Sequence, residues 1–340
     1  MPGKLITFLG CGSWGAALGA ILANKGFFVR YWHRNQSAIN EMQFSRKHYL
    51  LYDVNFNKNV SFFSEIESAV NEANYIVLAV PSQHIREVIT KAKKHIDPSA
   101  LIINVAKGIE NETLKIMSEV IFDVNGNISN YVTLSGPSHA EEVVSSMPTA
   151  VVAASQNIEA SKIVQALFST NKFRVYTNED LIGVEICGSA KNVIAIAAGF
   201  CDGFGYGDNT KSALITRGIK EVARLGLKSG AKFETFFGLA GIGDLIVTCE
   251  SIHSRNRKLG ERIGRGVSLD NAIGKSHMVV EGVKSAFSIK SLSEKYEIEM
   301  PICDSVFKVL YESADPVEEV NILMTRNLKS ESFYSSSSFK

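Results

Sequence analysis

The sequence lacks any large excess of charge of one sign. Its 340 residues contain 36 Lys and Arg against 35 Asp and Glu, which gives a formal net charge of +1 at pH 7. Proteins that bind nucleic acids or anionic membranes usually carry a basic excess. We therefore expect no nucleic-acid partner, and a basic patch is to be sought only locally.

Cysteine is scarce, and long hydrophobic runs are missing. The cysteines are odd in number and widely spaced, namely Cys11, Cys187, Cys201, Cys249 and Cys303. This spacing favours small buried residues in a reducing compartment over a disulfide framework or a zinc site. The N-terminal run LITFL is too short for a signal sequence, and we expect no segment near the roughly 20 apolar residues of a membrane span. The expected protein is soluble and cytoplasmic, without membrane insertion or bound metal.

The first half of the chain alternates short apolar runs with helical patterns. The expected strands are Leu5–Leu9, Phe28–Trp32, Tyr75–Val80, Leu101–Val105, Tyr131–Leu134, Ala150–Ala153 and Phe173–Tyr176. Helical periodicity between them is clearest at Trp14–Lys25, Ser64–Asn71 and Ser82–Lys94. Such alternation indicates βαβ units, and continuously apolar strands indicate a sheet covered on both faces. The pattern predicts an α/β fold with a largely parallel sheet.

Strand patterns stop after about Asn178, and helical patterns follow. The expected helices are Leu181–Phe200, Asp208–Lys228, Phe233–Phe237, Ser254–Ile263, Leu269–Ile273, Gly282–Tyr296 and Ser305–Glu312. The length suggests roughly two domains. We therefore predict a dinucleotide-binding domain over residues 1–178, an all-helical domain over 179–330 and a disordered serine-rich tail over 331–340.

A glycine motif directly follows the first expected strand. Gly10, Gly12 and Gly15 form G-x-G-x-x-G between that strand and the next helix. These glycines allow a tight turn and let the backbone approach a pyrophosphate at the helix N-terminus. The motif and its context predict a dinucleotide site, with a plain turn as the alternative.

The end of the second expected strand bears on the choice of cofactor. His33 lies 18 residues past Gly15, about where an acidic residue would bind the ribose hydroxyls of NAD. His33 and Arg34 stand there, with no carboxylate. An arginine at this place can accept a 2′-phosphate, so we predict NAD or NADP, with NADP at least accommodated. A solvated surface arginine is the alternative.

Two further strand ends carry polar or glycine residues. Ligands of open α/β sheets bind at the carboxyl ends of the strands. Lys107 follows one strand end, where it either faces an anionic partner in the crevice or is a solvated charge. Gly136 follows another, ahead of a helix start near His139 that would present backbone N–H groups to an anion.

Lys191 stands within the small and apolar stretch GVEICGSAKNVIAIAAGF. A buried amine is costly unless it is paired, and burial lowers its pKa toward the range suited to proton transfer. Asn192 adds a hydrogen-bonding group beside the amine. The alternative is a lysine paired with a carboxylate for structure alone.

Two later segments supply charge. Asp244, after a glycine-rich stretch, could orient a lysine, accept a substrate hydroxyl or cap a helix. Ser254 is a plausible N-cap, and Arg255 and Asn256 follow it in a basic first turn. Cations there oppose the helix dipole, so either a phosphate explains them or the helix is a solvated basic one.

In this order, the motifs resemble the family of bacterial NAD(P)-dependent glycerol-3-phosphate dehydrogenases. They are GCGSWGAALG, VAKGIE, LSGPSHAEE, SAKNVIAIAAGF, ALITRG, GLAGIGDL, SRNRKLG and VVEG, with a further likeness in EMPICDSVFKVL. The resemblance implies interconversion of dihydroxyacetone phosphate and sn-glycerol 3-phosphate for phospholipid synthesis. It also implies a Rossmann-like, doubly wound domain, an all-α substrate domain and often a homodimer.

The resemblance also implies roles for individual residues. Lys191 matches the proton donor and acceptor. The implied substrate contacts are Lys107, Gly136, Ser138, Lys191, Asn192, Asp244, Ser254, Arg255 and Asn256. The implied cofactor contacts are Gly10, Gly12, Ser13, Trp14, Gly15, His33, Arg34, Tyr49, Lys107, Ala140, Arg255, Val279 and Glu281. The segment HYLLYDVNF departs from the family pattern, because it lacks the Pro-Gly that often follows the tyrosine.

Two alternatives stay open at this point. One is a reductase of the same two-domain plan that acts on another oxo compound, against which the basic turn argues. The other is a non-catalytic dinucleotide-binding redox sensor, which would leave Lys191 and its small neighbours unexplained.

Overall fold

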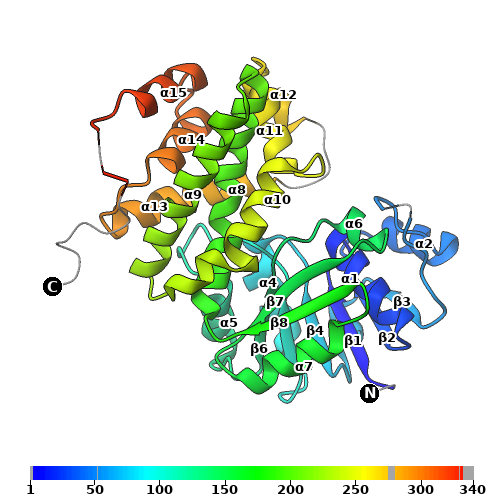
Figure 1. Cartoon of the computed structure of the whole chain (residues 1–340). Helices are drawn as coiled ribbons and strands as arrows, with labels where there is room; N and C mark the ends of the chain where they lie inside the picture. Colours follow the sequence, from blue (N-terminus) through cyan, green and yellow to red (C-terminus); the bar gives the residue numbers. More distant parts are fainter. Residues whose placement is uncertain (1–2, 52, 275–279, 329, 332–340) are drawn as a thin grey trace.

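The computed structural model describes residues 3–51, 53–274, 280–328 and 330–331. The expectations for Val279 and for the tail beyond Glu331 therefore lie outside the described residues. The first half of the chain forms a sheet with flanking helices, and the second half forms a helical bundle beside it (Figure 1).

The sheet has eight strands in the order β3-β2-β1-β4-β5-β6-β7-β8. Neighbouring strands are parallel except for β6 and β7, which pair antiparallel. The strands are β1 (Leu5–Leu9), β2 (Phe28–Trp32), β3 (Val60–Phe63), β4 (Tyr75–Leu78), β5 (Leu101–Asn104), β6 (Tyr131–Ser135), β7 (Thr149–Ala154) and β8 (Phe173–Asn178). The predicted α/β fold with a mostly parallel sheet is confirmed.

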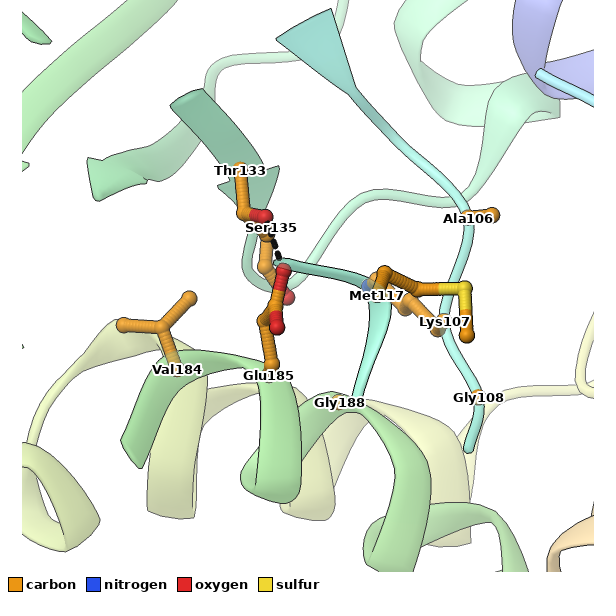
Figure 2. A pocket seen from close by; sticks show the side chains of 9 residues that line it. All are labelled: Ala106, Lys107, Gly108, Met117, Thr133, Ser135, Val184, Glu185 and Gly188. Atoms are coloured by element: carbon orange, nitrogen blue, oxygen red, sulfur yellow. Dashed lines mark hydrogen bonds between the residues drawn. The ribbon is translucent and has the colours of Figure 1, made fainter. Parts of the chain in front are cut away.

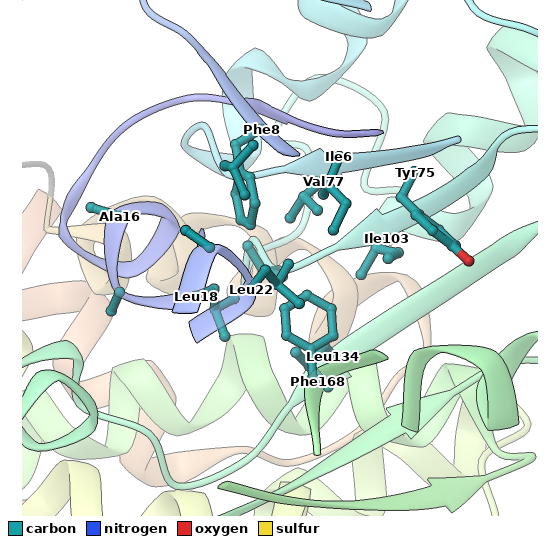
Figure 3. Close-up of a cluster of buried hydrophobic side chains, with 14 of the residues drawn as sticks. Ile6, Phe8, Ala16, Leu18, Leu22, Tyr75, Val77, Ile103, Leu134 and Phe168 are labelled. Carbon is teal, nitrogen blue, oxygen red and sulfur yellow. The ribbon is translucent and has the colours of Figure 1, made fainter. Parts of the chain in front are cut away.

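Helices cover both faces of the sheet, as a doubly wound fold requires. They are α1 (Ser13–Asn24), α2 (Gln36–Ser45), α3 (Ile66–Val70), α4 (Ile85–Ala92), α5 (Met117–Asn125), α6 (Ala140–Val144) and α7 (Ile158–Phe168), with 3₁₀ turns η1 (Ser82–His84) and η2 (Lys93–His95). Alternate residues of one strand enter different cores. On β4, Val77 packs with α1 and α7, whereas Ile76 and Leu78 pack with α3, α4 and α5. Figure 3 shows the first of these cores.

The first-half predictions were right for seven strands and missed one. β3 pairs only with β2 at the edge of the sheet, and its sequence VSFF is short and ends in a polar turn. Neither its length nor its composition separates it from a loop. Helices α2, α5 and α7 were also not predicted.

Among the described residues of the second half, every regular element is a helix. It contains α8 (Leu181–Phe204), α9 (Asp208–Lys228), η3 (Phe233–Phe237), η4 (Leu239–Gly243), α10 (Asp244–Glu250), α11 (Arg255–Gly264), α12 (Leu269–Ile273), α13 (Glu281–Lys295), α14 (Pro301–Tyr311) and α15 (Pro316–Met324). The predictions missed η4 and α15, gave no bounds for the helix expected after Asp244, which is α10, and ended α8 four residues early.

Helix α8 is the centre of the bundle. By length and hydropathy it could cross a membrane, so the expectation that no segment approaches a membrane span was wrong. In the structure, however, 94% of its most apolar stretch is buried inside the protein. Such burial is typical of a core helix, and the amino end of α8 is capped by Asp180, whose carboxylate accepts from the Gly183 N–H at 2.9 Å.

Small residues let α11 lie directly against α8. A Cβ atom at Gly199 would collide with the main chain at Arg257, and a Cβ at Gly260 would collide with the main chain at Ile196. This close approach brings the beginning of α11, which follows Ser254, beside the part of α8 that carries Lys191. The glycines of the helical half therefore position two of the predicted site segments together.

Candidate active site

Lys191 lies at the junction of the two halves of the molecule. Its side chain is 8% exposed, and its Nζ donates to Asp244 Oδ1 at 2.7 Å and to Thr248 Oγ1 at 2.7 Å. Lys107, which follows β5, donates from its own Nζ to Asp244 Oδ2 at 2.7 Å and to the Gly136 carbonyl at 3.0 Å. One buried carboxylate thus holds two lysines, one from each half of the chain.

Burial and charge set the ionisation of this group. Burial lowers the pKa of Lys191 to about 8, while Asp244 opposes the fall and Lys107 adds to it. Burial by itself would raise the pKa of Asp244, but the two ammonium groups outweigh burial and leave that pKa below its ordinary value. Near neutral pH the arrangement is an ionised carboxylate beside an amine poised to lose its proton. That is the chemistry of a general acid and base.

Asp244 and Thr248 owe their places to α10. Asp244 is the first residue of that helix, and Thr248 lies four residues on, so both side chains share one face. The Thr248 hydroxyl also donates to the Asp244 carbonyl at 2.6 Å. Thr248 was not predicted as a site residue, although its spacing of four residues from Asp244 was an available signal.

Asn192 and Asn256 connect α8, α11 and α13. Asn256 Nδ2 donates to Asn192 Oδ1 at 2.9 Å, and the Gly282 N–H donates to Asn256 Oδ1 at 3.0 Å. Both amides are buried. The structure thereby brings three predicted motifs together, because Gly282 ends the VVEG segment.

The two arginines in the basic first turn of α11 have different surroundings. Ser254 caps α11 by accepting from the Arg257 N–H at 3.2 Å, as predicted. Arg257 Nη1 binds Asp202 at 2.5 Å and Glu261 at 3.1 Å, so its charge is balanced within the protein. Arg255 is exposed at the beginning of the helix, beside buried Asn256. Its exposure in the first turn of α11 lets an external anion reach it.

The loop after β6 lies beside the two lysines. Ser138 Oγ donates to the Gly136 carbonyl at 2.9 Å, so this carbonyl accepts from both Ser138 and Lys107. The helix predicted to begin near His139 is the short α6, whose first residue is the buried Ala140. The loop therefore reaches the Lys107 ammonium through its backbone.

Glu185 joins the two halves just beneath this loop. Its carboxylate accepts from the Ser118 N–H at 3.0 Å, the Ser118 hydroxyl at 2.8 Å, the Tyr131 hydroxyl at 2.6 Å and the Thr133 hydroxyl at 2.6 Å. Figure 2 shows Glu185 reaching from α8 toward Thr133, with Ser135 and Lys107 nearby. The cavity that these residues line has a volume of about 10 Å³, too small for a substrate. Glu185 is a structural link that the sequence analysis missed.

The glycine turn has the geometry that a dinucleotide needs. Gly10 has φ of +114°, and a Cβ there would lie 2.6 Å from the Ala79 carbonyl oxygen. At Gly12, the N-cap of α1, a Cβ would meet nothing within 4 Å, which leaves open space at the start of a 12-residue helix. Ser13, Trp14 and Gly15 form the first turn of that helix. These residues fit a pyrophosphate at the helix N-terminus.

The end of β2 carries the predicted adenosine-side residues. The Tyr49 hydroxyl lies 3.4 Å from His33 Nε2, and the two rings meet edge to face. Arg34 is exposed beside them. The structure therefore brings His33, Arg34 and Tyr49 together.

Glu281 lies in the helical half of the chain, at the beginning of α13. Its carboxylate accepts from the Ser82 hydroxyl at 2.9 Å and from the Ser82 N–H at 3.3 Å. It also borders Gly108, the residue after Lys107. The structure thus brings the predicted cofactor residue Glu281 of the helical half next to the segment of the sheet half that carries Lys107.

All five cysteines are free and buried, as the sequence predicted. Over the described ranges of the chain, no group of three or more His, Cys, Asp or Glu side chains could hold a metal ion.

Family comparisons cover both halves of the chain. The model of the NAD-dependent glycerol-3-phosphate dehydrogenase N-terminus matches residues 5–161, and that of the C-terminus matches residues 180–321. A glycerol-3-phosphate dehydrogenase [NAD(P)+] of Clostridium perfringens is 49% identical over 327 residues, covering 96% of this chain and 98% of the relative. The chain belongs to the NAD-dependent glycerol-3-phosphate dehydrogenase family.

Other relatives agree with this assignment. The enzyme of the same name from Clostridium acetobutylicum is 50% identical over 331 residues, covering 97% of this chain and 99% of the relative. The crystal structure of glycerol-3-phosphate dehydrogenase from Coxiella burnetii is 38% identical with a TM-score of 0.91, covering 95% of this chain and 99% of that one. A ketopantoate reductase from Ralstonia eutropha covers 93% of this chain and 100% of its own, at 14% identity and a TM-score of 0.62, and shares the fold alone.

Proposed function

We propose that the protein catalyses the reversible, NAD(P)H-dependent reduction of dihydroxyacetone phosphate to sn-glycerol 3-phosphate for glycerophospholipid synthesis. Family membership supports the reaction, and the single observation that supports its chemistry is the Lys107–Asp244–Lys191 group at the junction of the two halves. The bound nicotinamide supplies the hydride. This chain must then supply a proton to the carbonyl oxygen and a site for the phosphate.

Lys191 is the proposed proton donor and acceptor. In the reduction direction its ammonium protonates the carbonyl oxygen, and in the oxidation direction the neutral amine accepts the hydroxyl proton. Asp244 and Thr248 fix the direction of the amine, and Lys107 helps to lower its pKa. General acid–base catalysis of this kind contributes roughly 10²–10⁴-fold.

The remaining predicted residues divide between substrate and cofactor. Lys107, Gly136 and Ser138 would line the substrate from the sheet side, and Asn192, Ser254, Arg255 and Asn256 would line it from the helical side. The glycine turn, with His33, Arg34 and Tyr49, would hold the dinucleotide, while Ala140, Glu281 and Val279 would complete its site. The proposed division is a cofactor-binding domain over residues 1–178 and a substrate domain over 179–330.

We propose that the protein is located in the cytoplasm and forms a homodimer. Five free, buried thiols are consistent with a reducing compartment. We propose neither a nucleic-acid partner nor membrane insertion. The balanced net charge supports the first statement, and the burial of α8 supports the second.

The test is the absorbance at 340 nm with purified protein, dihydroxyacetone phosphate, and NADH or NADPH in parallel. Decay that depends on the phosphorylated ketone is expected, and the two rates would show what His33 and Arg34 select. Cofactor binding without decay would instead favour another oxo substrate or the redox sensor.

Arg255 provides a test of phosphate recognition. Arg255→Ala should raise KM for dihydroxyacetone phosphate about 10- to 100-fold, because a hydrogen bond to a charged group contributes about 1.5–3 kcal/mol. The measurement is KM at saturating cofactor. Arg265→Ala is the matched control, since Arg265 lies just past the end of α11 and pairs with Glu261 at 2.5 Å. An unchanged KM in Arg255→Ala would count against the phosphate contact.

A further inference from the structure

His48 is a buried histidine to which the proposed reaction gives no role. It is fully buried, in a segment between Arg46 and Asn57 that contains no proline or glycine. Its Nδ1 accepts from the Leu50 N–H at 3.1 Å and from the Leu51 N–H at 2.9 Å. Its Nε2 lies 3.0 Å from the Cys11 carbonyl oxygen. Both ring nitrogens are therefore used.

These contacts define the tautomer. A nitrogen that accepts two N–H groups carries no hydrogen, so the ring hydrogen is on Nε2 and is donated to the Cys11 carbonyl. Burial lowers the pKa of His48, the bond to Cys11 opposes the fall, and His33 adds to it. The imidazole is thus a neutral bridge with an acceptor at one end and a donor at the other.

The donor end of this bridge holds the glycine turn. Cys11 lies between Gly10 and Gly12, and its carbonyl and the Gly12 N–H point in opposite directions across a trans peptide. The neighbouring anchors are the Gly10 N–H, which donates to the Trp32 carbonyl at 3.1 Å, and the Gly12 carbonyl, which accepts from Ala16 N–H at 2.9 Å. His48 supplies the anchor between them. Because His48 holds the Cys11 carbonyl, the N–H of Gly12, the N-cap of α1, points away from the imidazole ring.

The acceptor end organises the loop that carries Tyr49. The His48 and Tyr49 rings lie 4.7 Å apart, and the Tyr49 and His33 rings lie 5.8 Å apart. The backbone N–H of His48 also donates to the Val54 carbonyl at 3.1 Å, and this bond joins the two ends of the loop. One imidazole therefore connects the turn proposed to hold the pyrophosphate with the residues proposed to face the adenosine.

We propose that His48 is a positioning residue for the dinucleotide, which fixes the Cys11–Gly12 peptide and the Tyr49 loop in the arrangement that binds the cofactor. The proposal rests on the proposed dinucleotide site, but not on the identity of the substrate. Loss of the bridge should weaken cofactor binding, because the turn and the loop would then have to be ordered by the cofactor itself.

Three variants separate the two ends of the bridge. His48→Phe keeps a ring and removes both hydrogen-bonding functions. His48→Asn keeps an acceptor near Nδ1 but loses the donor to Cys11, whereas His48→Gln can place an N–H near Nε2. We expect the Kd for NADH to rise about 10-fold in the Phe and Asn variants, since each leaves the buried Cys11 carbonyl without its donor. The Gln variant should stay within about 3-fold of the unmodified protein.

The readout is a direct fluorescence titration with NADH, which needs no turnover. At saturating NADH, kcat and the KM for dihydroxyacetone phosphate should change less than about 2-fold in every variant. A purely structural role would lower the thermal midpoint and leave the Kd unchanged. His95→Asn is the control, because His95 is an exposed histidine near Glu67.

An unchanged Kd in His48→Asn, or an equal rise in all three variants, would overturn the proposal. The Asn and Gln variants keep a polar side chain at this site. Their Kd values can therefore be compared with each other even if His48→Phe fails to fold. Failure of the unmodified protein to bind either NADH or NADPH would overturn both this proposal and the proposed function. Binding without reduction of dihydroxyacetone phosphate would contradict the proposed function alone, and the titrations would still decide the role of His48.

Discussion

Replacement of Lys191 by Ala or Met is expected to reduce turnover by about 10²–10⁴-fold and to leave the Kd for the cofactor unchanged. Lys191 is proposed to move the proton at the carbonyl oxygen, and alanine or methionine at this position supplies no ionisable proton. Its Nζ lies between Asp244 and Thr248, both of which belong to α10 in the helical half. The glycine turn lies on the sheet side and does not depend on it.

The Lys191 variants should fold. Asp244 keeps its pairing with Lys107 when Lys191 is removed, so no buried carboxylate is left without a cation. Lys211→Met is the matched control, since Lys211 is a largely buried lysine, 13% exposed, that pairs with Asp202 at 2.8 Å and has no contact with Asp244 among the described ion pairs. The measurements are kcat with dihydroxyacetone phosphate and cofactor Kd by fluorescence. Turnover close to that of the unmodified protein, or loss of cofactor binding, would contradict the assigned role.

Asp244→Asn should both slow the reaction and destabilise the protein. Removing this carboxylate leaves the buried Lys191 and the partly buried Lys107 facing each other without a counter-charge. Breaking a buried ion pair in this way costs about 3–5 kcal/mol in the free energy of unfolding. The pKa of Lys191 should fall further below its ordinary value, because Asp244 is the main group that raises it.

The kinetic consequence of Asp244→Asn follows from that pKa. With less of the ammonium form at pH 7 and its orientation lost, reduction should slow by about 10²-fold or more. The control is Asp180→Asn, which removes another buried carboxylate, one that accepts from Gly183 and Lys232 N–H groups. It should destabilise the protein without moving the pH dependence of the reaction. Equal kinetic effects of the two substitutions would contradict a specific role for Asp244.

Much of the fold could be predicted because its signals are local. Apolar runs such as LITFL and the glycines after it are properties of a few neighbouring residues, and β1 begins and ends where the sequence predicted. β3 was missed because VSFF is short and lies at the sheet edge, where its position depends on pairing with β2. The burial of α8 likewise depends on its neighbours, whereas its composition alone also suits a membrane.

The site was predictable in its parts but not in its connections. Lys191 stands out as a single cation among small residues, and the strand ends mark Lys107 and Gly136. The hydrogen bonds that organise them join residues far apart in the chain, such as Lys107 with Asp244 and Glu185 with Thr133. His48 gave no signal, because its role depends on a carbonyl contributed by another loop.

The central claim, that Lys191 moves the proton, is tested most directly by the pH dependence of kcat/KM in both directions. This ratio reports the ionisation of the free enzyme, in which the pKa of Lys191 is about 8. Measurements between about pH 7 and 10 keep a substrate phosphate, whose second pKa is about 6, as the dianion throughout.

Reduction needs the ammonium, so its kcat/KM should fall as pH rises through about 8. Oxidation needs the neutral amine, so its kcat/KM should rise through the same pH and then level off. Two limbs of opposite sign at one pKa are the predicted result. Profiles that are flat across pH 8, or that change in the same direction, would contradict the account.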